Sequence, residues 1–179
     1  MWLFPLLVTL VALHAGDQPQ VDVCALLTSA DFESVLGETI KERKPGTQPA
    51  GALQTSQCFF ATSSAKSVSL TLTRTNPGGR GGLTAREYWR RQFAASEHDA
   101  ADDRRARPIA GLGDEAFWTG NRFAGALYVL RGDAFLRVSV GGIRDENKRI
   151  EASQRLAREA LRRLDGLKNL DFGILNLEF

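Results

Sequence analysis

The chain has 179 residues, of which 43% are hydrophobic and 25% are charged, and its formal net charge is +2. This length and composition favour one globular domain and exclude a chain that is disordered throughout. The net charge is too small to indicate nucleic acid or a strongly anionic membrane surface as the partner.

Residues 1–16 (MWLFPLLVTLVALHAG) form an apolar leader, and no charged residue precedes Asp17. The run is shorter than the roughly 20 apolar residues of a transmembrane helix and is typical of a signal-peptide core, although it lacks the usual Lys or Arg at its start. Ala15 is the small residue that cleavage before Gly16 requires. We therefore expect a signal peptide over 1–16, a periplasmic or secreted protein, and no transmembrane segment in the mature chain. The alternative is a buried N-terminal helix or strand.

The chain contains two cysteines, Cys24 and Cys58. Val23 is not the small residue that a lipoprotein signal has before its cysteine, which argues against a lipid anchor at Cys24. Two cysteines in an exported chain usually pair, and we expect a disulfide between them. Closing a loop of this size stabilises a protein by at most about 4 kcal/mol in the chain-entropy model. The absence of a Cys-x-x-Cys motif or a neighbouring histidine argues against a reactive thiol.

The first predicted element of the mature domain is a short helix in LLTSADFESVLG. Thr28 or Ser29 can cap its N-terminus, and Gly37 can end it. Residues 38–57 contain prolines, glycines and polar side chains, which predict mainly loop with one short strand near 39–42.

The middle of the chain predicts a hairpin followed by a second helix. One strand is expected over 58–61 and the next over 67–75, where apolar and hydroxyl side chains alternate as in a half-buried strand. The glycine-rich NPGGRGG is a connector. Thr84 and Glu87 have the spacing of a capping box and predict a helix start.

The C-terminal part predicts strands and the longest helix. One strand is expected after the glycine-rich turn at 111–114, and two more flank a Gly132-Asp133 hairpin turn. Asp145 can cap the following helix, and Gly166 can end it. Beyond it, apolar residues alternate in 168–179, which predicts an edge strand or a loose tail.

The resulting order is helix, strands, helix, three strands, helix. This order predicts an antiparallel sheet with helices packed on it, the α+β class. We expect a single disulfide-stapled α+β domain over 17–179.

The stretch GLGDEAFWTG at 111–120 looks like a binding signature. Gly111 and Gly113 can adopt positive φ at no steric cost, and Asp114 can accept backbone N–H bonds, so we expect a structural turn. The alternative is a ligand or metal site that uses Asp114 and Glu115. Adjacent residues of a strand point to opposite faces, which makes a shared ion difficult.

Several short motifs together resemble a family of exported bacterial proteins grouped as a domain of unknown function, many of them actinobacterial lipoproteins. The motifs are VCALLTSADFESVLG, CFF, GLGDEAFW, LYVLRGDAFLRVSV and LAREALRRL, and they extend over residues 22–165. The resemblance implies a small α/β sandwich like that of the photosystem accessory protein PsbP, a disulfide and an extracytoplasmic address. It supplies no catalytic residues.

Few catalytic side chains are available. Cleavage of the leader leaves His98 as the one histidine, so neither a zinc site with several histidines nor a recognisable catalytic triad can be built. Oxygen and nitrogen ligands gather in one charged loop, which we interpret as solvated: Glu97, His98, Asp99, Asp102 and Asp103. We interpret the RGD tripeptide at 131–133 as a hairpin turn. We expect no metal and no cofactor.

An aromatic group is the best remaining candidate for a binding site. Its members could line an apolar cleft between helix and sheet, with ordinary core packing as the alternative. They are Tyr88, Trp89, Phe93, Phe117 and Trp118.

These observations favour a non-enzymatic envelope protein that binds a partner protein or a small apolar ligand. One alternative is a glycan hydrolase that pairs Asp114 or Glu115 with a carboxyl group from 97–103. Another is a structural subunit that adds the strand expected in 168–179 to a partner's sheet.

Overall fold

The computed structural model describes residues 21–76, 79, 81–94 and 106–174. The described elements are the 3-10 helix η1 (Val23–Leu26), α1 (Ser29–Leu36), β1 (Ile40–Ala50), β2 (Leu53–Thr62), β3 (Ser67–Thr75), α2 (Ala85–Ala94), β4 (Arg107–Pro108), β5 (Glu115–Gly120), β6 (Gly125–Arg131), β7 (Ala134–Gly141) and α3 (Glu146–Ile174).

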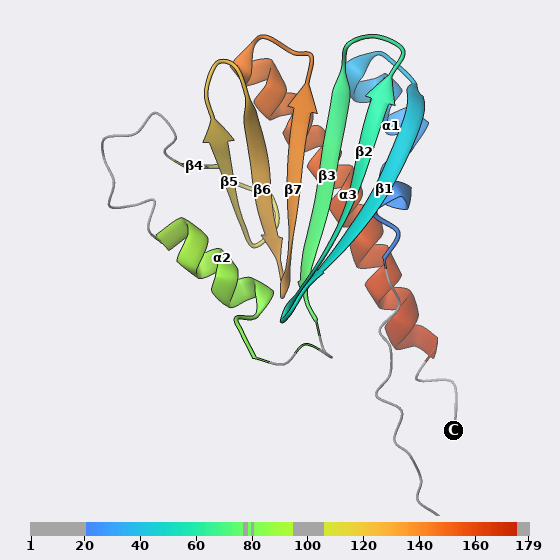
Figure 1. Ribbon diagram of the computed structural model, residues 1–179. Coiled ribbons are helices and arrows are strands. Elements are labelled where there is room, and N and C mark those ends of the chain that lie inside the picture. The colour runs from blue at the N-terminus through green and yellow to red at the C-terminus, as the bar shows by residue number, and fades with distance from the viewer. Residues whose placement is uncertain (1–20, 77–78, 80, 95–105, 175–179) are drawn as a thin grey trace, which may run out of the picture.

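One antiparallel sheet organises the molecule, with strand order β1-β2-β3-β7-β6-β5-β4 (Figure 1). Helices α1 and α3 lie behind the sheet in the view of Figure 1, and α2 packs against its other face. The α+β fold expected from the sequence is confirmed. The sheet consists of two meanders, β1–β3 and β4–β7, which meet where β3 pairs with β7.

The face under α3 holds the main core. Along β3, Val68, Leu70 and Leu72 are buried towards this face, whereas Ser69 and Thr71 lie on the other face and are half-buried. The alternation of apolar and hydroxyl side chains predicted for 67–75 therefore corresponds to the two faces of this strand. The second, smaller cluster lies under α2 and is mostly aromatic.

Strands β1 and β2 are much longer than the sequence predicts. Residues 38–57, expected to be mainly loop, form most of a hairpin that turns at Gly51, which has φ +59°. Strand β1 is an edge strand and its side chains are mostly exposed, so it carries no hydrophobic alternation to reveal it. Pro45 pairs with Cys58 in the register, and an edge strand tolerates a proline because its other side has no strand to bond.

Helix α3 continues past the point where the sequence predicts its end. Gly166 stays helical, without the positive φ of a C-cap glycine, and the helix runs to Ile174. Extending a formed helix adds one hydrogen bond per residue, which offsets the roughly 1 kcal/mol cost of one glycine. The edge strand expected in this tail is therefore wrong for 168–174, and 175–179 lie outside the described residues. Within the described chain, no helix is both long and apolar enough to cross a membrane.

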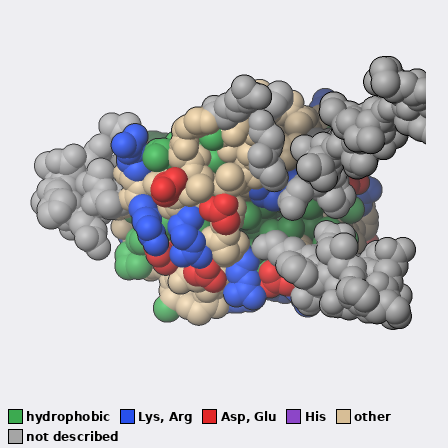
Figure 2. Space-filling model, turned by 90° about the horizontal axis from the view of Figure 1, so that it is seen from below, with side chains coloured by type: hydrophobic (Ala, Val, Ile, Leu, Met, Phe, Trp, Pro, Cys, Tyr) green, Lys and Arg blue, Asp and Glu red, His purple; other side chains and the backbone are tan. Residues whose placement is uncertain are grey.

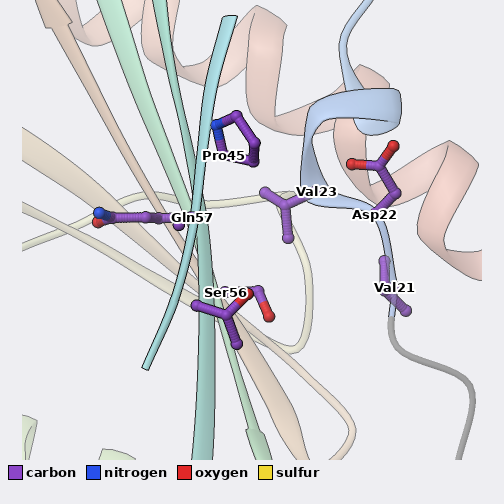
Figure 3. A pocket seen from close by; sticks show the side chains of 8 residues that line it. Val21, Asp22, Val23, Pro45, Ser56 and Gln57 are labelled. Carbon is purple, nitrogen blue, oxygen red and sulfur yellow. The ribbon is translucent and has the colours of Figure 1, made fainter. Parts of the chain in front are cut away.

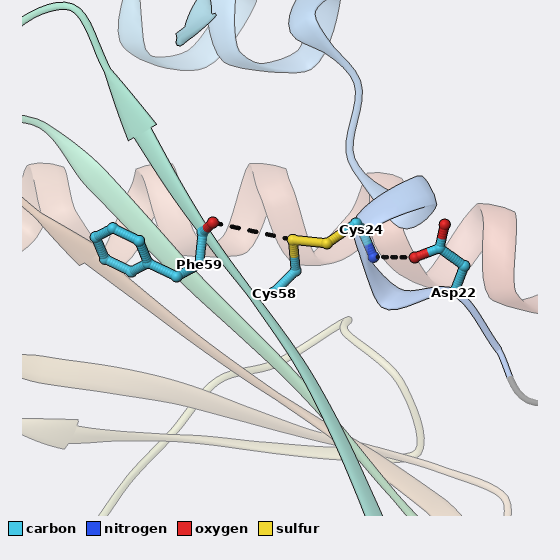
Figure 4. The surroundings of a disulfide bond; sticks show 4 residues. All are labelled: Asp22, Cys24, Cys58 and Phe59. Carbon is cyan, nitrogen blue, oxygen red and sulfur yellow. Dashed lines mark hydrogen bonds between the residues drawn. A yellow bond between two sulfur atoms is a disulfide. The ribbon is translucent and has the colours of Figure 1, made fainter. Parts of the chain in front are cut away.

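The predicted disulfide between Cys24 and Cys58 is confirmed, with Cα atoms 5.2 Å apart (Figure 4). It fastens η1 to the middle of β2, where Cys58 is fully buried. The Asp22 carboxylate accepts from the Cys24 N–H at 2.9 Å. The Cys58 sulfur lies 4.0 Å from the Phe59 carbonyl oxygen, a contact rather than a hydrogen bond because a disulfide sulfur carries no proton.

The helix starts follow the capping residues that the sequence offers. Thr28, rather than Ser29, caps α1 and forms a capping box with Asp31. A capping box forms at the start of α2, where the Glu87 carboxylate accepts from the Thr84 N–H and the Thr84 hydroxyl accepts from the Glu87 N–H. The Asp145 carboxylate caps α3 by accepting from the Lys148 N–H at 2.8 Å.

Candidate functional site

The GLGDEA turn is bound into the sheet. Gly111 and Gly113 have φ of +70° and +63°, and a Cβ on Gly113 would collide with the Leu130 backbone oxygen. The Asp114 N–H donates to that same oxygen at 2.8 Å. The Asp114 carboxylate accepts from the Gly132 N–H at 2.9 Å. The bond from Gly132 is the first cause of its lowered pKa. These contacts have the form of a structural turn.

The RGD tripeptide belongs to the same set of contacts. Arg86, at the start of α2, bonds Asp114 at 2.7 Å, the Gly132 carbonyl at 3.0 Å and, through its own N–H, the Asp133 carboxylate at 3.0 Å. Arg131 pairs with Asp165 at 2.9 Å. Seen from below in Figure 2, basic and acidic side chains adjoin one another on the described surface. This paired network fastens α2 to the β6–β7 turn.

Four of the five predicted aromatic residues come together under α2. Trp89 and Phe93 have ring centroids 4.3 Å apart, and Phe93 stacks on Phe117 at 4.8 Å. Tyr88 stacks on Phe135 at 6.0 Å. The indole N–H of Trp89 donates to Glu115 at 2.9 Å.

The fifth aromatic residue, Trp118, lies on the opposite face of the sheet. It is fully buried in the main core, and its indole N–H donates to Glu146 at 3.1 Å. Trp118 follows Phe117 directly along β5, and adjacent residues of a strand face opposite ways. A cleft that includes both side chains cannot form.

A pocket with a volume of about 420 Å³ lies between α2 and the sheet. Its walls combine aromatic rings with threonine hydroxyls and one charged group. The lining residues are Leu53, Thr55, Thr71, Thr73, Tyr88, Trp89, Gln92, Phe93, Tyr128, Phe135 and Arg137. Phe117 contacts the rings of Trp89 and Phe93 without lining the pocket.

Sequence reasoning missed the sheet side of this pocket. Tyr88, Trp89 and Phe93 were found because they share one helical face. The sheet residues are brought together by pairing across the junction of the two meanders, where Thr71 lies opposite Arg137 and Thr73 lies opposite Phe135. The alternation along each strand predicts which residues share a face, but not which strands are neighbours.

Two other hollows are less suited to a ligand. The first, about 250 Å³, lies between the residues before η1 and the β1–β2 edge, where Val23 and Pro45 point into it and Gln57 points away (Figure 3). The other, about 550 Å³, lies between α1 and the start of α3. Two of its basic side chains already bond to the chain: Lys66 donates to the Leu36 carbonyl at 2.7 Å and Arg155 to the Ser34 carbonyl at 2.9 Å.

The remaining candidates concern carboxylates. In the described part of the chain, no group of three or more His, Cys, Asp or Glu side chains is placed to hold a metal ion. The Glu97–Asp103 loop lies outside the described residues. Asp114 and Glu115, the other half of the hydrolase hypothesis, are bonded to Arg86 and Trp89.

The fold and the pocket define a disulfide-stapled α+β domain with an aromatic pocket on one sheet face. No family model matches the chain, and neither a curated protein nor a solved structure matches it. The resemblance to the exported bacterial family stays a prediction that rests on the short motifs.

Proposed function

We propose that this protein is a non-enzymatic, exported envelope protein that binds a small, mainly apolar ligand between α2 and the sheet. The observation that carries the proposal is the aromatic pocket. Its volume of about 420 Å³ falls within the range of roughly 300–1,000 Å³ of small-molecule sites. Mostly apolar walls with a few polar groups are also typical of such sites.

The position of the pocket supports a ligand rather than a filled core. Helix α2 packs on one sheet face, and the pocket is lined by residues of α2 and of strands β2, β3, β6 and β7. Tyr88 retains 41% of its exposure although it stacks on Phe135. An aromatic side chain at the mouth of a pocket can close over an apolar molecule, which removes both surfaces from water.

Export is supported by the disulfide together with the apolar leader. Disulfides persist in oxidising compartments such as the periplasm and the cell exterior. The Cys24–Cys58 bond encloses the α1 and β1 segments, so an oxidising compartment would stabilise the fold.

The test is binding of N-phenyl-1-naphthylamine, an uncharged fluorophore that brightens in apolar surroundings. We expect saturable enhancement with the mature protein. Thr71→Trp fills the pocket from its floor and should abolish the enhancement. Ser69→Trp adds the same side chain to the same face of β3 but does not line the pocket, so it should leave binding intact. No enhancement with the native chain, or equal enhancement in both variants, would overturn the proposal.

A further inference from the structure

Among the described residues that line the aromatic pocket, Arg137 is the one that carries a charge. It lies on β7, a central strand, with Thr71 of β3 on one side and Tyr128 of β6 on the other. All three side chains line the pocket. A cation is thus placed in the middle of a mostly aromatic and hydroxyl-lined surface.

The guanidinium of Arg137 is held at one end. Its Nε donates to the Tyr128 hydroxyl at 3.1 Å, and its Cζ lies 5.8 Å from the centroid of the Tyr128 ring. Within the described residues, its two terminal nitrogens have no hydrogen-bond partner and it forms no ion pair. The bond to Tyr128 orients the plane of the guanidinium and leaves its two terminal nitrogens available to a ligand.

The other arginines that are buried or half-buried in the described chain differ on this point. Each uses a terminal nitrogen to donate to a protein oxygen. They are Arg74 to Gln54, Arg86 to Asp114, Arg149 to the carbonyls of Asn121 and Ile143, and Arg163 to Asp31. A half-buried cation gains most from an anionic partner, because charge-assisted bonds are the strong ones. Arg137 has the place for such a partner and no protein group that fills it among the described residues.

We propose that the ligand is an amphiphilic monocarboxylate whose carboxylate binds the terminal nitrogens of Arg137 while its apolar body lies against the rings of Tyr88, Trp89 and Phe135. This inference rests on the proposed function and names the chemical class of the ligand. A planar carboxylate matches the two parallel N–H donors of a guanidinium. The Thr71 hydroxyl, on the neighbouring strand, is available as a further donor.

The single charge favours a carboxylate over a phosphate. A phosphate carries up to two negative charges and is typically held by several basic groups or by a helix N-terminus. Among the described residues, no lysine and no second arginine lines the pocket. The N-terminus of α2 is already occupied, because the Asp133 carboxylate accepts from the Arg86 N–H at 3.0 Å and the Glu87 carboxylate accepts from the Thr84 N–H at 2.8 Å.

The test compares dodecanoate with dodecan-1-ol, which have chains of the same length, as competitors that displace N-phenyl-1-naphthylamine at pH 8. In the native protein we expect dodecanoate to compete at a concentration about 10- to 100-fold lower than the alcohol, as charge-assisted bonds imply. Arg137→Gln should remove this preference, which is measured as the ratio of the two competing concentrations within the variant itself. Arg91→Gln removes an exposed cation beside the pocket-lining Gln92 and should keep the preference.

The outcomes separate this inference from the proposed function. If the fluorophore binds in the pocket but dodecanoate and dodecan-1-ol compete equally, the carboxylate is wrong and the apolar site stands. If the preference survives in Arg137→Gln, the anion binds elsewhere and the inference is overturned. If the Thr71→Trp variant binds the fluorophore as the native chain does, the pocket itself is wrong. Thermal unfolding of Arg137→Gln, and of a second variant Arg137→Met, shows whether a loss of preference reflects a folded protein.

Discussion

The two faces of the sheet are built differently from the same strands. The face under α1 and α3 is closed, and its large side chains, such as Phe60 and Leu156, are fully buried. The described residues cover the face under α2 only in part, and Tyr88 at its border is 41% exposed. We therefore expect stability to reside mainly on the closed face, whereas the open face has the aromatic pocket and the available cation of the proposed binding site.

The largest expected effect comes from a cavity in the closed face. Phe60 is fully buried and packs 5.2 Å from the Phe32 ring, so Phe60→Ala should lower the free energy of unfolding by about 3–5 kcal/mol. Tyr88→Ala removes an aromatic ring from the open face and should cost clearly less, because much of that ring is already in water. Urea titrations of both variants measure the difference. Equal losses would show that the two faces contribute alike.

Loss of the disulfide should have the next largest effect. A Cys24→Ser, Cys58→Ser double variant should lose about 2–5 kcal/mol, because the closed loop no longer restricts the unfolded chain. The bond lies on the closed face, so binding of N-phenyl-1-naphthylamine by the folded fraction should be unchanged. Chemical denaturation and fluorophore titration at low temperature test both parts. Reduced stability with lost binding would mean that the two faces are coupled.

Acid should weaken both faces, and the closed face more. Burial raises the pKa of Asp31, but hydrogen bonds from Arg163 and Thr28 outweigh it and hold the pKa below 3.8. The Gly132 N–H, followed by Arg86, lowers the pKa of Asp114 from the same value. A carboxylate with a lowered folded-state pKa stabilises the protein above its unfolded-state pKa, and this contribution is lost as the pH falls through about 4 and below.

Two single variants measure how much each carboxylate contributes to this loss of stability in acid. Asp31→Asn breaks a bidentate pair with Arg163 whose side chains are 9% and 22% exposed, and it should cost about 2–3 kcal/mol at pH 7. Asp114→Asn weakens a more exposed pair and should cost about 1 kcal/mol or less. Both should flatten the decline of the urea midpoint between pH 5 and pH 3. An unchanged decline in both variants would assign it to other groups.

Local chemistry made much of this fold predictable. Thr28, Thr84 and Asp145 cap helices where the sequence places them, because a cap depends only on residues three positions apart. Gly113 has the positive φ that the glycine-rich turn of the sequence predicts. The disulfide followed from a count of two cysteines in a chain expected to be exported.

Features that depend on distant residues were not predictable in the same way. Strand β1 gains its structure from pairing with β2, and its own exposed, charged residues carry no alternation that would mark it. The aromatic face of α2 was visible as a helical pattern. Arg137 was not visible as its partner, because its position under α2 depends on which strands are neighbours in the sheet.

The junction of β3 with β7 has a consequence for how the protein matures. Each meander can form from contacts close in sequence, but the β3–β7 pairing closes a long loop and belongs to the slow class of folding events. During synthesis from the N-terminus, β1–β3 can form first. One edge of β3 then stays unpaired until β7 has been made. Thr71 and Arg137 come from opposite sides of this junction. The aromatic pocket is therefore among the last parts of the molecule to form, and occupancy by the proposed ligand would report that assembly is complete.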